Sequence, residues 1–334
     1  MLCVTTALLD AVAGPEVRRE IDRRIDLPLL AHSEGEVPRA AVACALCALL
    51  FHGLIQRVPE GRAYVDEQLS MGRKVCFDHG AIRTVDGFTG SLPQGDGAFA
   101  RILEPLGFIR TGVYPLDRLK MTGRVFTHAD DPENIAQFFV SELHVSRFSA
   151  QFQEAARRTM STSVDPLPAP ATGLLERLRR DKSLPMDEAA QLLRWLLGCF
   201  GRHHEEPHLQ DYELLLAESA EMAWIATEGN VFNHATDRVR DIRHVAEEQR
   251  RAGRPLKKDI EISGTGRVLQ TAFRASTVRR RFLTEAGHVE RDVPGSFYEF
   301  IQRERLPSGR LDLSFDSGNA TGIFGMTAGG QHAR

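Results

Sequence analysis

The chain has 334 residues, of which 42% are hydrophobic and 26% charged, and its formal net charge is −3. These proportions are ordinary for a globular protein, and the small charge gives no electrostatic reason to expect nucleic acid or an anionic membrane as a partner. The five cysteines lack the pattern of a disulfide framework, and no signal peptide is evident at the start of the sequence, so we expect a cytoplasmic protein.

Residues 1–70 are predicted to form a helical N-terminal segment. An Ala/Leu-rich run at 40–50 contains Cys44 and Cys47 as a C-x-x-C pair. No second cysteine pair is present to complete a zinc site, so we expect this run to be a buried core helix. The run is also shorter than the roughly 20 apolar residues that cross a bilayer.

Two similar modules follow, separated by a helical insertion. Residues 71–150 predict a strand at 74–85, a short helix at 98–106 and strands near 108–114, 121–128 and 138–148. Residues 151–225 return to helical patterns around a Pro/Ala-rich linker at 165–170. Residues 226–310 predict a strand starting near 230, a helix at about 241–252 and strands near 257–263, 267–275 and 296–304. We expect residues 311–334 to be a partly disordered tail. The sequence therefore indicates an α+β protein with two pseudo-symmetric strand-helix-three-strand modules.

A short motif occurs once in each module. Residues 77–83 read F-D-H-x-x-x-R, and residues 232–238 read F-N-H-x-x-x-R. Glu142 follows His79 at nearly the same spacing at which Glu299 follows His234. The repeat predicts a metal held between two halves of a pseudo-symmetric sheet. Two unrelated core or surface histidines, repeated by chance, are the alternative.

The motif also places an arginine on the face of each histidine. Residues i and i+4 of a strand point to the same side, so His79 shares a face with Arg83, and His234 shares one with Arg238. At about 3.3 Å per residue, the roots of each pair lie roughly 13 Å apart. A metal-bound molecule with a second carboxylate four or five carbons away would fit this gap, and the planar guanidinium suits that carboxylate. The geometry favours a dicarboxylic acid as the ligand.

Two imidazoles and one carboxylate form the facial triad that non-haem Fe(II) oxygenases use. Three protein ligands leave positions open for a chelating 2-oxo acid and for dioxygen. Zinc accepts the same residue types, so the ligands alone leave the identity of the metal open.

The second module resembles a known enzyme superfamily. Residues 266–273 (G-R-V-L-Q-T-A-F) and 296–303 (S-F-Y-E-F-I-Q-R) are similar to the C-terminal signature of 4-hydroxyphenylpyruvate dioxygenase, in which the glutamate ligates iron. This signature is typical of the vicinal oxygen chelate superfamily. The run F-D-H-G-A-I-R-T-V at 77–85 and the long gap between the histidines resemble a narrower family, the 2-oxoadipate dioxygenase/decarboxylases (2-hydroxyglutarate synthases). The likeness extends from about residue 70 to 305.

The resemblance implies a vicinal-oxygen-chelate-like fold with His79, His234 and Glu299 as ligands of Fe(II). It implies that Arg83 is the catalytic and substrate-binding arginine that grips the distal carboxylate. Glu142 is expected to have a structural role, and Arg238 to form an ion pair on the strand face.

The activity implied is oxidative decarboxylation and hydroxylation of 2-oxoadipate, with O2, to 2-hydroxyglutarate and CO2, a step of lysine catabolism. Two alternatives remain. One is a glyoxalase-type isomerase or lyase that uses Zn or Ni without O2, and the other is a non-catalytic metabolite-binding protein. Two further runs are expected to carry no site: 201–208, a solvated His-rich loop, and 264–267, a tight turn without the helix that a phosphate site requires.

Overall fold

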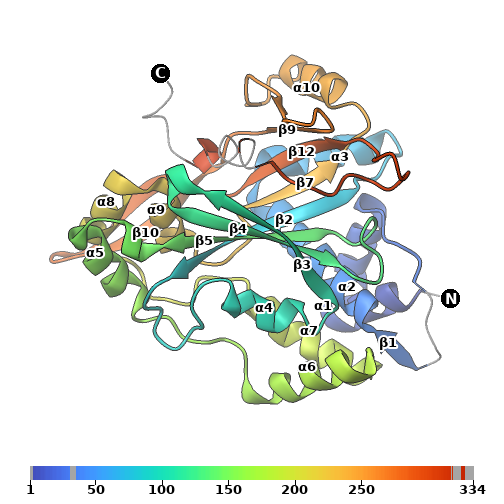
Figure 1. Ribbon diagram of the computed structural model, residues 1–334, viewed down its shortest axis with the longest axis horizontal. Coiled ribbons are helices and arrows are strands. Elements are labelled where there is room, and N and C mark those ends of the chain that lie inside the picture. Colours follow the sequence, from blue (N-terminus) through green and yellow to red (C-terminus); the bar gives the residue numbers. More distant parts are fainter. Residues whose placement is uncertain (1–2, 31–34, 317, 319–324, 328–334) are drawn as a thin grey trace.

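One curled sheet of eight strands runs through the middle of the molecule (Figure 1). The structure is a computed structural model that describes residues 3–30, 35–316, 318 and 325–327. The strands lie in the order β3 (Phe108–Leu116), β4 (Met121–His128), β5 (Gln137–His144), β2 (Phe77–Asp86), β7 (His234–Arg238), β12 (Phe297–Arg303), β9 (Val268–Ala272) and β8 (Glu261–Ile262).

The sheet consists of two similar halves that meet at its centre. Strands β2 and β7 pair antiparallel across the junction, and each pairs in parallel with the last strand of its own module, β5 or β12. A helix follows each central strand, α4 (Gly97–Leu103) in the first half and α10 (Ile242–Arg251) in the second. The predicted α+β fold with a duplicated strand-helix-three-strand order is thus confirmed.

The second half contains one hairpin that the sequence analysis did not anticipate. Strands β10 (Thr277–Thr284) and β11 (Gly287–Pro294) pair with each other, outside the main sheet, between β9 and β12. Val278 and Phe282 pack toward α8 (Leu209–Glu218) through Tyr212, whereas the intervening arginines are more exposed. Three consecutive arginines within β10 obscure the apolar alternation by which a strand is recognised.

The remaining helices surround the sheet (Figure 1). They are α1 (Val4–Arg24), α2 (Arg39–Arg57), α3 (Pro59–Ser70), α5 (Ala150–Met160), α6 (Ala169–Asp181), α7 (Met186–Gly198) and α9 (Ala220–Glu228), with short 3-10 turns η1 (Asp117–Leu119), η2 (Val145–Arg147) and η3 (Gly325–Thr327). A two-stranded sheet of β1 (Glu36–Pro38) and β6 (Ser183–Pro185) joins the N-terminal helices to the insertion.

Local sequence explains where several helices begin and bend. The side chains of Ser149, Ser219 and Asp241 accept hydrogen bonds from backbone N–H groups in the first turns of α5, α9 and α10. Such N-caps satisfy amides that have no partner within the helix. Helix α1 kinks at Gly14, whose φ of 82° is left-handed, directly before Pro15.

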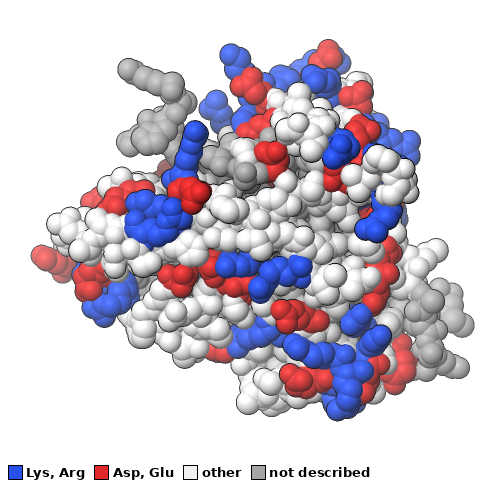
Figure 2. Space-filling model, viewed as in Figure 1, with Lys and Arg blue, Asp and Glu red and all other residues white. Residues whose placement is uncertain are grey.

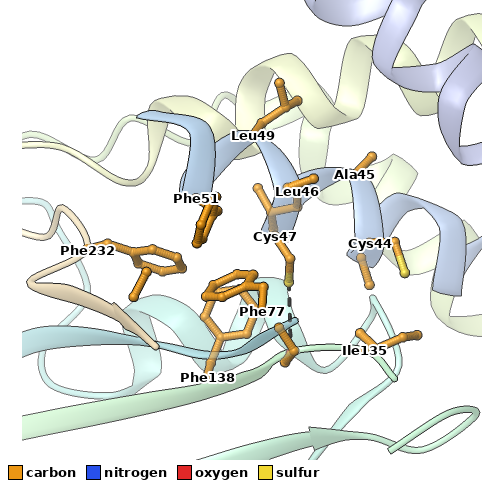
Figure 3. Close-up of a cluster of buried hydrophobic side chains, with 14 of the residues drawn as sticks. Cys44, Ala45, Leu46, Cys47, Leu49, Phe51, Phe77, Ile135, Phe138 and Phe232 are labelled. Carbon is orange, nitrogen blue, oxygen red and sulfur yellow. Dashed lines mark hydrogen bonds between the residues drawn. The ribbon is translucent and has the colours of Figure 1, made fainter. Parts of the chain in front are cut away.

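Helix α2 fills the core against one face of the sheet, and Figure 3 shows its side chains above the central strands. Cys47 and Phe51 of the helix belong to one apolar cluster with Phe77, Phe138 and Phe232. Burying each aromatic ring contributes about 1.5–3 kcal/mol. The helix has a mean hydropathy of 1.6 over a window long enough to cross a membrane, but 72% of that window is buried inside the protein. The prediction that the C-x-x-C pair packs in the core is confirmed, since Cys44 and Cys47 are free and buried.

A glycine lets the central strand approach the core closely. A Cβ atom on Gly80 would lie 2.4 Å from the ring of Phe232, so no larger residue fits there without displacing that ring. The neighbouring residues His79 and Ala81 point to the other face of the sheet.

The surface carries both signs of charge. In the face shown by Figure 2, basic and acidic side chains are intermixed. Of the predicted disordered tail, residues 317, 319–324 and 328–334 lie outside the described residues. Residues 311–316 pack against the protein, and Asp312 and Phe315 are buried.

Candidate metal centre

Three of the predicted residues converge on the face of the sheet opposite α2. His79 is on β2, His234 on β7 and Glu299 on β12, which are adjacent strands. Their ligand atoms all lie within 4.8 Å of one another, and all three residues are buried. The Nε2 atoms of His79 and His234 lie 3.6 and 3.0 Å from Glu299 Oε2. The ligand set proposed from the sequence is therefore brought together in space.

Sheet register explains this convergence. Thr236 is opposite His79 on one side and opposite Glu299 on the other, while Ala81 is opposite His234. In each module the residue two positions after the histidine faces the histidine of the other module. The two imidazole rings consequently approach to a centroid distance of 5.5 Å.

Neighbouring polar groups hold the ligand side chains in place. Asp78 Oδ2 lies 2.9 Å from His79 Nδ1, which fixes the proton on Nδ1 and leaves the Nε2 lone pair facing the centre. Glu299 Oε1 accepts a hydrogen bond of 2.6 Å from Gln270 Nε2, and Oε2 accepts one of 2.9 Å from Thr236 Oγ1. Both carboxylate oxygens are therefore oriented by partners on neighbouring strands.

The charges of these groups depend on one another. Burial alone would raise the pKa of Glu299, but the two histidines hold that pKa well below its usual range. Burial also lowers the pKa of His79, yet the hydrogen bonds with Asp78 and Glu299 outweigh it and raise that pKa overall. For His234, burial lowers the pKa; the carboxylate of Glu299 opposes that shift, whereas His79 and Arg83 act in the same direction as burial. An ionised carboxylate beside two imidazole nitrogens, all buried, is a donor set that suits a divalent transition metal.

Arg83 lies on the same face of β2 as His79, with Ala81 between them. Its side chain is fully buried, and its guanidinium carbon lies 4.9 Å from the centroid of the Trp224 ring on α9. Burial lowers the pKa of Arg83 to about 10, although the negative charge of Glu221 opposes the shift. The side chain thus places a cation beside the metal centre in a dry environment.

Glu142 does not occupy the position that its spacing suggested. Glu299 is opposite Thr236, and the equivalent position in the first module, opposite Ala81, is Phe139. Glu142 is three residues further along β5, so it points to the other face, where it accepts a hydrogen bond of 2.8 Å from the Asp96 amide. Equal spacing in sequence therefore does not mean an equivalent position in the sheet, because the strands end at different points.

Arg238 is an ion-pairing residue, as expected. Its guanidinium lies 3.8 Å from Asp78 Oδ1 and donates to the backbone carbonyl of Glu133 at 2.9 Å. The two excluded runs are indeed a loop and a turn. His204, however, is buried and not solvated, and its ring nitrogen bonds the carbonyl of Ala226 at 2.9 Å.

Several residues around the centre were not identified from the sequence. Gln270 and Arg303 lie within the two signature runs, so the resemblance could have indicated them, and Asp78 adjoins His79. Phe315 had no signal at all, yet its ring packs edge-on against His79 at a centroid distance of 4.8 Å.

Comparison with known proteins agrees with this fold. A family model described as 2-oxoadipate dioxygenase/decarboxylase matches residues 29–317. A search of curated proteins found no match. A crystal structure from Ralstonia eutropha JMP134, described as a glyoxalase superfamily protein, is 53% identical, covers 95% of this chain and 99% of its own, and superposes with a TM-score of 0.92.

More distant structures share the fold. Hydroxyglutarate synthase from Oryza sativa, solved with 2-oxoadipate, is 20% identical over 91% of this chain and 100% of its own, with a TM-score of 0.67. The synthase from Pseudomonas putida, also with 2-oxoadipate, is 17% identical over 88% of this chain and 74% of its own, with a TM-score of 0.63. The fold is that of the glyoxalase, or vicinal oxygen chelate, type. On the match to residues 29–317, the chain belongs to the 2-oxoadipate dioxygenase/decarboxylase family.

Proposed function

We propose that this protein is an Fe(II)-dependent dioxygenase that converts 2-oxoadipate and O2 into 2-hydroxyglutarate and CO2. The observation that carries the proposal is the convergence of His79, His234 and Glu299 on three adjacent strands, with Arg83 on the same face. Family membership and the 2-oxoadipate bound to the two hydroxyglutarate synthases support the choice of substrate. We further propose that the reaction takes place in the cytoplasm as a step of lysine degradation.

The proposed ligands are His79, His234 and Glu299. Fe(II) held by them would supply Lewis acidity toward a 2-oxo acid and redox chemistry toward dioxygen. Asp78 orients His79, while Thr236 and Gln270 orient Glu299. These contacts keep the donor atoms directed at one point before any substrate enters.

The arginine would determine which acid is bound. A substrate that lies along β2 from the centre toward Arg83 passes over Ala81, whose small side chain leaves room for a carbon chain. The buried guanidinium can then form two charge-assisted hydrogen bonds with a distal carboxylate. Such a contact is available to a dicarboxylic acid and unavailable to a monocarboxylic one.

The burial of the centre also serves the chemistry. His79 is 1% exposed, His234 7% and Glu299 0%, so little bulk water reaches the ligand atoms. Exclusion of water strengthens each polar contact with the substrate and protects reactive species from side reactions.

Oxygen uptake tests the proposal. Protein purified without oxygen and loaded with Fe(II) is mixed with 2-oxo acids of increasing chain length, with and without a distal carboxylate. We expect uptake with 2-oxoadipate, matched by CO2 and 2-hydroxyglutarate, and loss of uptake in His234→Ala. One tightly bound metal per chain without uptake for any acid would overturn the dioxygenase and favour the glyoxalase-type reaction.

A further inference from the structure

A short segment close to the C-terminus is fastened onto the face of the sheet that carries the metal centre. Four backbone groups of residues 312–315, called the wall segment below, bond to side chains of three different strands. In chain order, the Asp312 carbonyl accepts from Arg303 (3.0 Å), the Leu313 carbonyl from Gln137 (3.3 Å) and the Ser314 carbonyl from Arg303 (2.8 Å), while the Phe315 amide donates to Tyr114 Oη (3.1 Å). Side chains that bond several backbone groups of an irregular segment specify its position.

Arg303 links this segment to a proposed metal ligand. Its side chain is 0% exposed. Nε and Nη2 donate to the carboxylate of Asp78 at 2.9–3.1 Å, and Oδ2 of the same carboxylate also contacts His79 Nδ1. Nη1 donates to the two wall carbonyls. One planar cation therefore fixes both the backbone of the wall segment and the carboxylate that orients His79.

The ring of Phe315 lies where a substrate would pass. It is 9% exposed and shares an apolar cluster with Ala81, Val125 and Phe139. The same ring packs against His79 at 4.8 Å and beneath the Arg303 guanidinium at 4.9 Å. Since Ala81 lies between His79 and Arg83, a molecule that joins the metal to Arg83 contacts this cluster.

We propose that the wall segment forms one side of the substrate site, and that Arg303 is a positioning residue which joins this wall to the metal ligand His79. The inference rests on the proposed function, because it takes His79 as a ligand. Displacing the wall would weaken the hold of Arg303 on Asp78, and a change in the His79–Asp78 contact would shift the wall. One side chain, Arg303, thereby couples the shape of the substrate site to the geometry of the metal site.

Metal affinity tests the role of Arg303. Lysine keeps the charge beside Asp78 but lacks the fork that reaches Asp78 and two carbonyls together. We expect Arg303→Lys to bind Co(II), measured by anaerobic competition titration, about 10–100-fold more weakly than the parent chain, and to show an altered Co(II) spectrum. The control is Arg267→Lys, because Arg267 bonds the Asp312 carboxylate at 2.8 Å but does not touch Asp78. Arg267→Lys should change the Co(II) affinity by no more than about twofold, because partly exposed ion pairs contribute little free energy.

The outcomes separate the two proposals. Normal Co(II) affinity and spectrum in folded Arg303→Lys would overturn the coupling and leave the proposed function standing. A parent chain that binds no Co(II), or that binds it equally well as His79→Ala, would overturn both. Circular dichroism on every variant identifies a loss of fold.

Ligand binding tests the wall itself. Phe315→Leu enlarges the space beside Ala81 and leaves every ligand residue in place. On Co(II)-loaded protein, we expect the ratio of the Kd values of 2-oxoadipate and its one-carbon-longer homologue to shift toward the longer acid by about tenfold, as expected for one methylene in an apolar pocket. Phe300→Leu, a change in the core on the opposite face of β12, is the matched control and should leave the ratio unchanged. An equal ratio in Phe315→Leu and the parent chain would refute the wall.

Discussion

Replacing Arg83 with methionine removes the cation proposed to bind the distal carboxylate while keeping a long apolar side chain. The parent residue is fully buried, so a carboxylate that meets it has lost its water shell. Without the guanidinium that carboxylate would lose this charged partner. Removing one member of a buried, hydrogen-bonded charge pair costs about 3–4 kcal/mol, which corresponds to a roughly 100–1000-fold lower kcat/KM for 2-oxoadipate.

The informative comparison is with 2-oxohexanoate, which has the same chain length and a methyl group in place of the distal carboxylate. It cannot use the guanidinium, so Arg83→Met should lower its kcat/KM little or raise it. We therefore expect the preference for the dicarboxylic acid to disappear in the variant. The ratio of the two values is measured on the same preparation, so incomplete folding or metal loading cancels.

The matched control is Arg124→Met. Arg124 is on β4, which β5 separates from β2, and it pairs with Glu142, at 2.8 Å, on the opposite face of the sheet. Arg124→Met should leave the ratio of the kcat/KM values for the two acids unchanged. If Arg83→Met lowered kcat/KM for both acids by the same factor, Arg83 would act by supporting the sheet through its contact with Trp224. Its assignment as the partner of the substrate carboxylate would then be refuted.

Three further predictions follow from the fold. Glu299→Gln should lose the bound metal, measured by metal content after dialysis, whereas Glu142→Gln should keep it, because Glu142 points to the other face; equal loss in both would contradict this. Gly80→Ala should lower the free energy of unfolding by about 1–3 kcal/mol in urea titrations, because its Cβ would lie 2.4 Å from the Phe232 ring; an unchanged stability would mean that the ring relaxes freely. Burial raises the pKa of Asp237 to about 7, so the folded state keeps a proton that the unfolded state releases near pH 4. Stability should therefore fall between pH 4 and 7, by at most about 4 kcal/mol, and Asp237→Asn should flatten that fall; an identical pH profile in the variant would refute the assignment.

The elements that local pattern specifies could be predicted from the sequence. The strand around His79, the short helix after it and the paired strands that follow are close to their predicted bounds, because apolar alternation and turn residues are local signals. The hairpin β10–β11 was missed because its consecutive arginines hide the alternation. The two histidines and Glu299 could be named since the motif is repeated and the second module resembles a known signature.

Register was beyond what spacing along the chain could resolve. Glu142 and Glu299 follow their histidines at nearly equal distances, yet one faces the core helices and the other the metal centre. A shift of one residue moves each side chain of a strand to the other face of the sheet. The loops between corresponding strands of the two modules also differ in length. The contacts of Arg303 and Phe315 with the centre are also long-range, and no periodicity in residues 311–316 indicates them.

The junction between β2 and β7 has a consequence for how the chain acquires its metal. The two histidines belong to halves separated by helices α5 to α9, so neither half alone offers more than one imidazole to the site. An ion bound by both halves would act as a cross-link between them, and its binding free energy would add to the cohesion of the folded state. Loading can only follow the docking of the two halves. The metal content of a preparation would therefore report how much of the protein has completed that last step of assembly.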